Sequence, residues 1–505
     1  MLGYKMGGVM RDKGIFLTTL LFVFATFVAC TVKSGQGEKP RKLVASVEAE
    51  SGSFFGNVKA TAGKEGYSGD RFVTGFEQDE DSCEVVFSVP KETFYDLAFL
   101  IQSMGGHKEN FVFVDGVQQG SVVCDSGKVE EASLGRVFLS AGEHKVELKK
   151  SWGWINWDKL EVYESAPLPK DLYHASAKLS NPNASDNAKR VMSYLCDNYG
   201  KNILSGQYAD GGYASWEVFK LKENNGGKEP AVIGLEMGHC CQTALNNQFT
   251  HPSVKSAKDA WEKGAIVTMC YHWLAPEKYL TGIWWKGFYE EAVNIPLEKI
   301  MNGEDEEGME LLLKDIEILA GQLGELKEAG VPVLWRPLHE AAGGWFWWGA
   351  HGAEAYKKLY VLMYQQLTEV YGLDNLIWVW NGQDREWYPG DEYVDIVGTD
   401  IYPKEREYAS HISKFLELYD WVGPGKLIIL SENGTMPDID AAVRDGAMWG
   451  LFCTWEGEFV INEGIKTTYS EKYTEKSVMQ KIYNHEKVIT LDELPDLKTY
   501  KIRKK

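Results

Sequence analysis

Eight apolar runs constrain the fold of the C-terminal part of the chain more than any other feature of the sequence. Each run ends in polar or aromatic residues and is followed by a stretch with helical periodicity. The runs cover residues 203–207, 231–237, 265–272, 331–340, 376–381, 394–402, 427–433 and 450–455. Apolar strands that alternate with helices form parallel sheets. Eight such units predict an α/β fold, a (β/α)₈ TIM barrel, with its active site at the carboxyl ends of the strands.

The preceding part of the chain has a different pattern, in which Gly, Asn and Asp separate short runs. Several runs alternate apolar and polar residues, and they cover residues 83–89, 94–101, 110–114, 136–139, 144–148 and 160–163. A spacing of about ten residues favours a small all-β, jelly-roll-like sandwich before the barrel. We therefore expect the sandwich at residues 43–165, a linker at 166–174, the barrel at 175–490 and a basic C-terminal tail at 491–505. A chain of 505 residues is long enough for these two domains.

The N-terminus has the composition of a targeting signal. Three basic residues precede an apolar run at residues 15–29, which has the length of a signal-peptide core and is short for a membrane span. A small residue followed by Cys30 resembles a loose bacterial lipobox, in which the cysteine is acylated. We expect residues 1–30 to be a lipoprotein signal with lipidation at Cys30, and residues 31–42 to be a tether. The protein is then exported and membrane-anchored, facing the periplasm or on the cell surface; soluble secretion after cleavage elsewhere is the alternative.

Composition excludes several classes of partner. Lys and Arg total 53 against 73 Asp and Glu, and the net charge of −20 argues against nucleic acid or an anionic membrane surface. The chain has 18 Trp, 25 Tyr and 21 Phe, whose rings suit sugar faces as well as a protein core. The cysteines include no CxxC pair, and adjacent Cys240 and Cys241 cannot easily converge with His239 on one tetrahedral metal ion. We expect no cofactor for catalysis.

Two glutamates stand at strand ends of the expected barrel. Glu340 ends the fourth run, and Glu432 lies near the end of the seventh. Such residues can face each other across the mouth of a barrel. Two carboxyl groups about 5–5.5 Å apart let one attack an anomeric carbon while the other protonates the leaving oxygen, which retains the anomeric configuration. From spacing alone, two ion-paired structural glutamates are the alternative.

The surroundings of Glu340 have a family resemblance. Residues 335–349, WRPLHEAAGGWFWWG, resemble the acid/base signature of glycoside hydrolase family 26, which is best known for endo-β-1,4-mannanases. Further segments resemble the family in the same order, at residues 203–207, 266–273, 387–390, 394–402 and 426–434. The resemblance implies a retaining endo-β-1,4-mannanase that acts on mannan, galactomannan or glucomannan by double displacement, with Glu340 as the acid/base and Glu432 as the nucleophile.

The resemblance also implies which residues contact the sugar. They are His272, Arg336, His339, Trp345, Tyr402 and Trp455. The Tyr402 phenol has a physical role of its own, because it can donate a hydrogen bond to the Glu432 carboxylate. A core histidine at His272 and a purely structural ion pair at Arg336 are the alternatives. The choice between the sugar site and barrel packing is also open for Trp347, Trp348, Gln207, Asn381 and Trp387.

The expected sandwich resembles carbohydrate-binding modules of family 35 or the related family 6. The resemblance rests on residues 47–50, 66–70 and 152–163. It implies a structural Ca²⁺ held by carboxylates, which are hard oxygen ligands, from Glu48, Glu50 and Asp158. It also implies sugar contacts by ring stacking and an amide hydrogen bond, from Trp152, Trp154 and Asn156. A tryptophan cluster that fills the sandwich core is the alternative.

Two departures from the family pattern concern the substrate. Ala341-Ala342 stands where Met-Asn often follows the His-Glu pair, and Leu274-Ala275-Pro276 stands where Asn-Asn-Pro is frequent. A related β-1,3-1,4-glucanase or xylanase is therefore kept as an alternative. A non-catalytic surface glycan-binding lipoprotein is a separate alternative, against which the two strand-end carboxylates argue. The expected partner is a β-mannan-type polysaccharide or oligosaccharide, bound by a monomer that contacts no nucleic acid and meets a membrane only through its lipid anchor.

Overall fold

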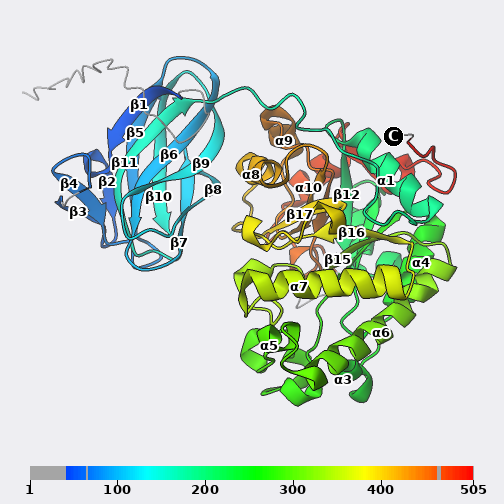
Figure 1. Cartoon of the computed structure of the whole chain (residues 1–505). Helices are drawn as coiled ribbons and strands as arrows, with labels where there is room; N and C mark the ends of the chain where they lie inside the picture. The colour runs from blue at the N-terminus through cyan, green and yellow to red at the C-terminus, as the bar shows by residue number, and fades with distance from the viewer. Residues whose placement is uncertain (1–40, 64–65, 463–467, 504–505) are drawn as a thin grey trace, which may run out of the picture.

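The computed structural model describes residues 41–63, 66–462 and 468–503. These residues form a β-rich unit and a larger α/β unit, joined by a single connection (Figure 1). The expected signal at residues 1–30, with its lipidation site Cys30, and almost all of the expected tether lie outside the described residues. No helix in the described part of the chain is long and apolar enough to cross a membrane.

The N-terminal unit is an antiparallel sandwich of two sheets. The first sheet contains β1 (Lys42–Glu48), β3 (Lys59–Ala62), β4 (Arg71–Thr74), β6 (Thr93–Ser103), β9 (Glu130–Leu139) and β11 (Ile155–Glu164). The second contains β2 (Ser53–Phe55), β5 (Ser82–Val89), β7 (Lys108–Val114), β8 (Val117–Cys124) and β10 (Gly142–Lys150). Buried and open positions alternate along β5 and β10, so one face of the sheet supplies the core. The predicted all-β sandwich is confirmed.

The C-terminal unit is a closed barrel of parallel strands. The eight strands are β12 (Ile203–Tyr208), β13 (Val232–Glu236), β14 (Ile266–Tyr271), β15 (Val333–Pro337), β16 (Leu376–Trp380), β17 (Ile396–Ile401), β18 (Leu427–Asn433) and β19 (Leu451–Thr454). Successive strands pair in parallel, and the pairing of β12 with both β13 and β19 closes the ring. Each predicted run overlaps one of these strands, and the predicted TIM barrel is confirmed.

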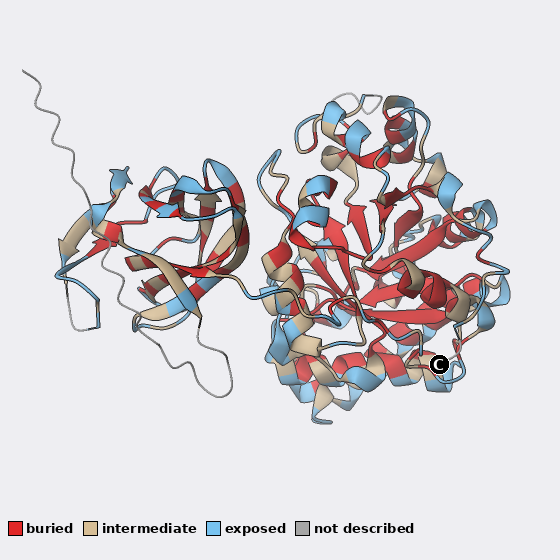
Figure 2. Cartoon of the chain, turned by 90° about the horizontal axis from the view of Figure 1, so that it is seen from above, coloured by how far each residue is buried: buried red, intermediate tan, exposed pale blue. Residues whose placement is uncertain are grey.

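Helices surround the barrel, so its strands are buried while the outer faces of the helices are exposed (Figure 2). The longer helices are α1 (Asp186–Asn198), α2 (Trp216–Asn224), α4 (Ser253–Lys263), α6 (Glu306–Glu328), α7 (Gly352–Tyr364), α8 (Ile412–Val422), α9 (Ile439–Asp445) and α10 (Lys476–Tyr483). Local capping defines where they begin. The Ser185 hydroxyl accepts from the N–H of Ala188 at the start of α1, and the Asp305 carboxylate accepts from the N–H of Gly308 at the start of α6.

The fourth barrel strand ends before the predicted run does. Pro337 closes β15, and Leu338 and Glu340 then adopt left-handed backbone conformations, with φ of 52° and 54°. Such conformations are costly for residues with a Cβ and persist where the surroundings impose them. The following turn is tight, because a Cβ on Gly349 would lie 2.0 Å from the Ala341 carbonyl oxygen. This turn places Glu340 just beyond the end of β15.

The C-terminal segment lies against the barrel. The Tyr500 hydroxyl donates to Asp197 Oδ2 at 2.8 Å, and the N–H of Arg503 donates to the Ser193 hydroxyl at 3.0 Å. Both acceptors belong to α1. The described part of the predicted basic tail therefore packs on the first barrel helix.

Candidate active site

Three carboxylates converge at the carboxyl ends of the barrel strands. Glu340 follows β15, Asp400 lies near the end of β17, and Glu432 lies near the end of β18. One oxygen atom from each lies within 4.8 Å of the other two. Active sites of (β/α)₈ barrels are built at this face. The structure therefore brings together the two glutamates that the sequence predicts as a catalytic pair, and adds Asp400 to them.

A buried arginine connects these carboxylates. Arg336 has no exposed surface, and its Nη1 donates to Asp400 Oδ2 at 2.7 Å. Nη2 donates to Glu432 Oε2, and Nε donates to the Tyr208 hydroxyl at 3.2 Å. This placement differs from the predicted sugar contact, because the guanidinium is enclosed and all of its named partners are protein groups. Arg336 is therefore a positioning residue that holds Asp400 and Glu432 at fixed places.

Asp400 is held from two further sides. The side-chain amide of Asn381 donates to its Oδ1 at 2.6 Å, and the Ser431 hydroxyl donates to the same oxygen at 2.8 Å. Asn381 is fully buried, so it belongs to this network and not to a sugar subsite. In the sequence, Asp400 has only its place near the end of the sixth run to distinguish it, and every other strand end shares that signal.

The two oxygens of Glu432 have different partners. Arg336 donates to Oε2, and the Tyr402 phenol donates to Oε1, as the sequence predicts. Burial and the neighbouring Asp400 charge raise the pKa of Glu432, while Arg336, Tyr402 and His272 oppose that rise. The carboxylate is thus oriented by donors on both oxygens and faces Glu340.

The carboxylate of Glu340 accepts fewer side-chain hydrogen bonds than that of Glu432. Trp345 Nε1 donates to its Oε2 at 3.1 Å. Burial, together with the charges of Asp400 and Glu432, raises the pKa of Glu340 further than that of Glu432. Glu340 therefore keeps its proton at a pH where Glu432 is already ionised. A proton donor paired with a carboxylate nucleophile requires this division.

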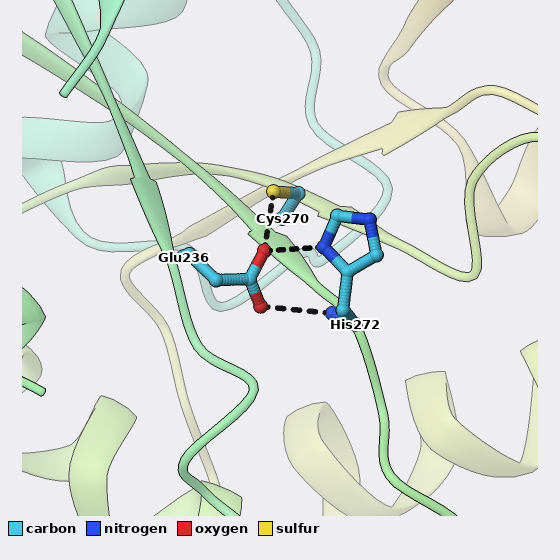
Figure 3. Close-up of side chains that lie close together, drawn as sticks. All are labelled: Glu236, Cys270 and His272. Atoms are coloured by element: carbon cyan, nitrogen blue, oxygen red, sulfur yellow. Dashed lines mark hydrogen bonds and ion pairs between the residues drawn. The ribbon is translucent and has the colours of Figure 1, made fainter. Parts of the chain in front are cut away.

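Two histidines lie beside the carboxylates. His272 Nδ1 lies 2.6 Å from Glu236 Oε2 (Figure 3), and His272 Nε2 lies 3.2 Å from His339 Nε2. Burial lowers the pKa of His272, but the charge and hydrogen bond of Glu236 outweigh burial and leave it raised. Burial and the charges of Arg336 and His272 lower the pKa of His339 well below its ordinary value. Sequence reasoning does not single out Glu236, whose one signal is its place in the second run.

The predicted aromatic platforms lie at different depths. Trp345 is 46% exposed and Tyr402 is 44% exposed, whereas Trp455 is partly buried. Trp347 and Trp348 have no exposed surface, and their indole N–H groups donate to backbone carbonyls. The open question about these two residues is therefore answered, because they belong to the barrel core. Trp345 and Trp455 keep the exposure that a sugar platform needs.

The tryptophans of the sandwich occupy two environments. Trp152 is 56% exposed and Trp154 is 52% exposed, whereas Trp157 is fully buried in the core. Asn156 is only 5% exposed, and its amide nitrogen donates to the Tyr67 hydroxyl at 3.0 Å. The predicted contact of Asn156 with a sugar is thus not available in this geometry, because strand β11 turns that side chain inward. Trp152 and Trp154 remain as an exposed aromatic pair.

Two of the predicted calcium ligands, Glu48 and Asp158, meet at Ser68, and the charge of Glu50 acts on Glu48 from nearby. The N–H of Ser68 donates to Asp158 Oδ1 at 3.0 Å, and its hydroxyl donates to Glu48 Oε2 at 2.8 Å. Burial raises the pKa of Glu48, and the nearby charges of Asp158 and Glu50 add to the rise. Glu50 Oε2 is buried and has no hydrogen-bond partner among the described residues. An unpaired carboxylate oxygen within an acidic group fits a hard cation with oxygen ligands.

Comparison with known proteins decides the family. Residues 180–493 match the sequence profile of glycosyl hydrolase family 26. The chain belongs to this family. Residues 45–164 match carbohydrate binding module family 35, so the sandwich is a module of that kind. The family 26 chain is 34% identical over 470 residues to a mannan endo-1,4-β-mannosidase of Thermothelomyces thermophilus, a match that covers 92% of this chain and 93% of that protein.

Solved structures resemble both units of the chain. The crystal structure of the Podospora anserina GH26-CBM35 β-(1,4)-mannanase matches with a TM-score of 0.63 and 32% identity, covering 91% of this chain and 100% of that one. A ruminal GH26 endo-β-1,4-mannanase matches with a TM-score of 0.62 and 27% identity, covering 91% of this chain and 99% of that one. This family 26 protein is therefore a glycoside hydrolase with an N-terminal carbohydrate-binding module.

The charge of Asp400 should influence the alkaline limit of hydrolysis. Asp400→Asn keeps the shape of the side chain but removes a negative charge close to Glu340, so the pKa of Glu340 should fall and the proton donor should ionise at lower pH. We expect the alkaline limb of the pH dependence of kcat/KM to shift to lower pH. The control is Asp186→Asn, an exposed aspartate on α1, which should leave the limb in place. An unshifted limb in Asp400→Asn would contradict this role.

Proposed function

We propose that this protein is a retaining endo-β-1,4-mannanase in which Glu432 is the nucleophile and Glu340 is the acid/base. The observation that supports this most directly is the approach of one oxygen of each carboxylate to within 4.8 Å of the other. A retaining enzyme needs carboxyl groups about 5–5.5 Å apart, while an inverting enzyme needs about 6.5–9.5 Å to admit a water molecule between them. The short separation favours retention.

The first step is the displacement of the leaving sugar. Glu432 attacks the anomeric carbon, the bond from that carbon to the glycosidic oxygen breaks, and Glu340 gives its proton to the departing oxygen. The nucleophilic oxygen loses its negative charge as the ester forms. Arg336 remains paired with Asp400 when this charge is lost, so the guanidinium stays in place during the step.

The second step reverses these roles. Glu340, now a carboxylate, removes a proton from water, the water oxygen attacks the anomeric carbon, and the ester bond to Glu432 breaks. The product keeps the configuration of the substrate, and both glutamates return to their starting protonation states. His272 contacts a hydroxyl group of the cleaved sugar, and Trp345 and Trp455 stack on pyranose faces beside it. His339, expected from the sequence to contact the sugar, is only 1% exposed and contacts His272 instead.

The substrate is β-mannan, galactomannan or glucomannan, and cleavage is internal. Two observations support this substrate. Several relatives are named mannan endo-1,4-β-mannosidases, and the matches to them cover most of each relative's length. The sandwich supplies a second contact to the polysaccharide through the exposed pair Trp152 and Trp154. A neutral glycan also suits a protein whose net charge of −20 favours no anionic partner.

Two further elements complete the proposal. In the sandwich, Glu48, Glu50 and Asp158 hold a structural Ca²⁺, which neutralises the three carboxylates and ties their strands together. At the N-terminus, the protein is exported and lipidated at Cys30, so residues 31–42 tether a monomeric enzyme to a membrane. Membrane fractionation of Cys30→Ser separates anchoring from soluble secretion, because a protein that still partitions with membranes would exclude the acyl anchor.

The two glutamates should fail differently when each is replaced. Glu432→Ala should abolish turnover of mannan and of activated aryl mannosides, because no nucleophile remains. Glu340→Ala should lose about 10²–10⁴-fold of its rate on mannan. It should lose far less in the first step on aryl mannosides, whose leaving groups need no proton.

Steady-state rates on mannan, galactomannan, lichenan and xylan, with an activated aryl mannoside alongside, check both the roles and the substrate. Glu328→Ala, an exposed glutamate on α6, serves as the control and should keep full activity. Unimpaired turnover by either active-site variant would refute the assignment. Absence of manno-oligosaccharides from the unaltered enzyme would refute the substrate.

Calcium should stabilise the sandwich. Binding to the folded state alone adds about 2.7 kcal/mol at a calcium concentration 100 times the dissociation constant. The thermal unfolding transition of the sandwich, followed by calorimetry, should therefore move up with Ca²⁺ and down with a chelator. Glu50→Gln should lose this response, while Glu92→Gln, an exposed glutamate between β5 and β6, should keep it. If the unfolding temperature of the sandwich in the unaltered protein does not change with Ca²⁺ or with the chelator, the site is excluded.

A further inference from the structure

A buried cysteine lies on a barrel strand, next to two residues already described. Cys270 belongs to β14 and has no exposed surface. Its Sγ lies 3.0 Å from Glu236 Oε2, and His272 Nδ1 lies 2.6 Å from the same oxygen (Figure 3). One donor atom from each of the three residues lies within 4.8 Å of the other two. The proposed hydrolytic mechanism uses neither the thiol nor the convergence of the three donors.

The barrel geometry produces this convergence. Glu236 at the end of β13 is the direct neighbour of Cys270 in the parallel pairing of β13 with β14. His272 follows Cys270 by two residues, so its side chain leaves the chain on the same side. The second carboxylate oxygen of Glu236 accepts from the backbone N–H groups of Gly238 at 2.6 Å and His272 at 2.9 Å. These bonds fix the carboxylate and leave Oε2 directed at the sulfur and the imidazole.

We propose that Glu236, Cys270 and His272 form a binding site for a thiophilic divalent cation of the zinc and cadmium class, and that the bound ion inhibits hydrolysis. A thiolate sulfur, an imidazole nitrogen and a carboxylate oxygen are the ligand types that zinc takes, with bonds of about 2.0–2.3 Å. A tetrahedral ion with such bonds separates its ligands by about 3.3–3.7 Å. The sulfur–oxygen distance of 3.0 Å and the nitrogen–oxygen distance of 2.6 Å therefore need to open by less than about 1 Å.

Binding exchanges protons for the ion. In the structure, hydrogen bonds from the thiol and the imidazole join the sulfur and the nitrogen to the carboxylate. When the ion binds, Cys270 releases its thiol proton and His272 releases the proton on Nδ1, both to solvent. The sulfur and the nitrogen each donate an electron pair to the ion, and no oxidation or reduction occurs. Two positive charges leave and two arrive, so the charge of the buried cluster is unchanged.

A neighbouring histidine supports His272 as a ligand. Ligating histidines commonly donate their second ring N–H to an acceptor, which fixes the ring. His272 Nε2 lies 3.2 Å from His339 Nε2, so the His339 ring is placed to accept that hydrogen. The side chains of His272 and Glu236 keep 19% and 22% of their surface exposed, which gives the ion a route from solvent. The fourth position of the ion is then open to a water or a sugar hydroxyl.

The ion would act on hydrolysis through His272. In the proposed mechanism this imidazole contacts the cleaved sugar, and an ion on its Nδ1 fixes the ring, so that the ring can no longer adjust to the substrate. The inhibition part of this inference rests on the proposed function, whereas the binding part does not.

Cadmium titration of the full chain tests the binding part. The charge-transfer absorption of a cadmium–thiolate bond reports coordination by sulfur directly, without any enzymatic activity. We expect a saturable signal from the unaltered protein and from Cys196→Ser, which removes a buried thiol on α1. Cys270→Ser should lose the signal. No saturable signal in the unaltered protein, or the same signal in Cys270→Ser, would overturn the proposal.

Thermal unfolding shows whether Cys270→Ser is folded. If it is not, a second variant tests the proposal. Glu236→Gln retains the thiol but removes the charged oxygen ligand, and it should weaken cadmium binding by more than about tenfold. An unchanged affinity would contradict the proposal.

Zinc should inhibit mannan cleavage by the unaltered protein and by Cys196→Ser, and Cys270→Ser should raise the half-inhibitory concentration more than about tenfold. Failure to cleave mannan at all would refute the proposed function and leave the absorption test standing.

Discussion

The catalytic face of this protein depends on one buried arginine, Arg336, which forms ion pairs with both Asp400 and Glu432. The guanidinium is wholly enclosed, and its donors reach a carboxylate on each of two adjacent strands. Removing one partner of such a pair leaves an uncompensated buried charge, at a cost of about 3–5 kcal/mol. The same pair keeps Glu432 oriented, and it sets the negative field of Asp400 that Glu340 experiences. The position of the nucleophile and the protonation of the acid are thus two consequences of one arrangement.

The acid depends on a different kind of constraint, which is the backbone after β15. Leu338 and Glu340 both have positive φ, and the turn that follows is closed by tight packing at Gly349. This geometry moves Glu340 past the strand end into a partly buried site beside two other carboxylates. Burial near like charges is the physical reason that one glutamate stays protonated while its neighbour ionises. The neutral His339 on the same turn adds no positive charge that would disturb this difference.

The sequence predicts the barrel and the two glutamates because both follow from local patterns. Apolar runs mark the strands, and strand ends of a barrel share one face. Asp400 and Glu236 could not be separated from other strand-end residues, because their importance depends on which side chains meet after closure. The inward turn of Asn156 and the enclosure of Arg336 depend on packing in the same way. In the sandwich, the sequence analysis does not predict β2, β3 and β4. These strands are short and partly exposed, so none of them forms an apolar run.

The central claim is that Glu340 and Glu432 act together, close enough for one to bond to the sugar while the other handles its proton. The most direct test is to measure, by proton NMR, the anomeric configuration of the product released from a β-mannan oligosaccharide. The spectra are taken early in cleavage, before mutarotation mixes the anomers. The β-anomer should appear first, and the α-anomer should grow only by mutarotation. Initial release of the α-anomer would show that water attacks the anomeric carbon directly, and it would rule out Glu432 as a nucleophile that bonds to the sugar.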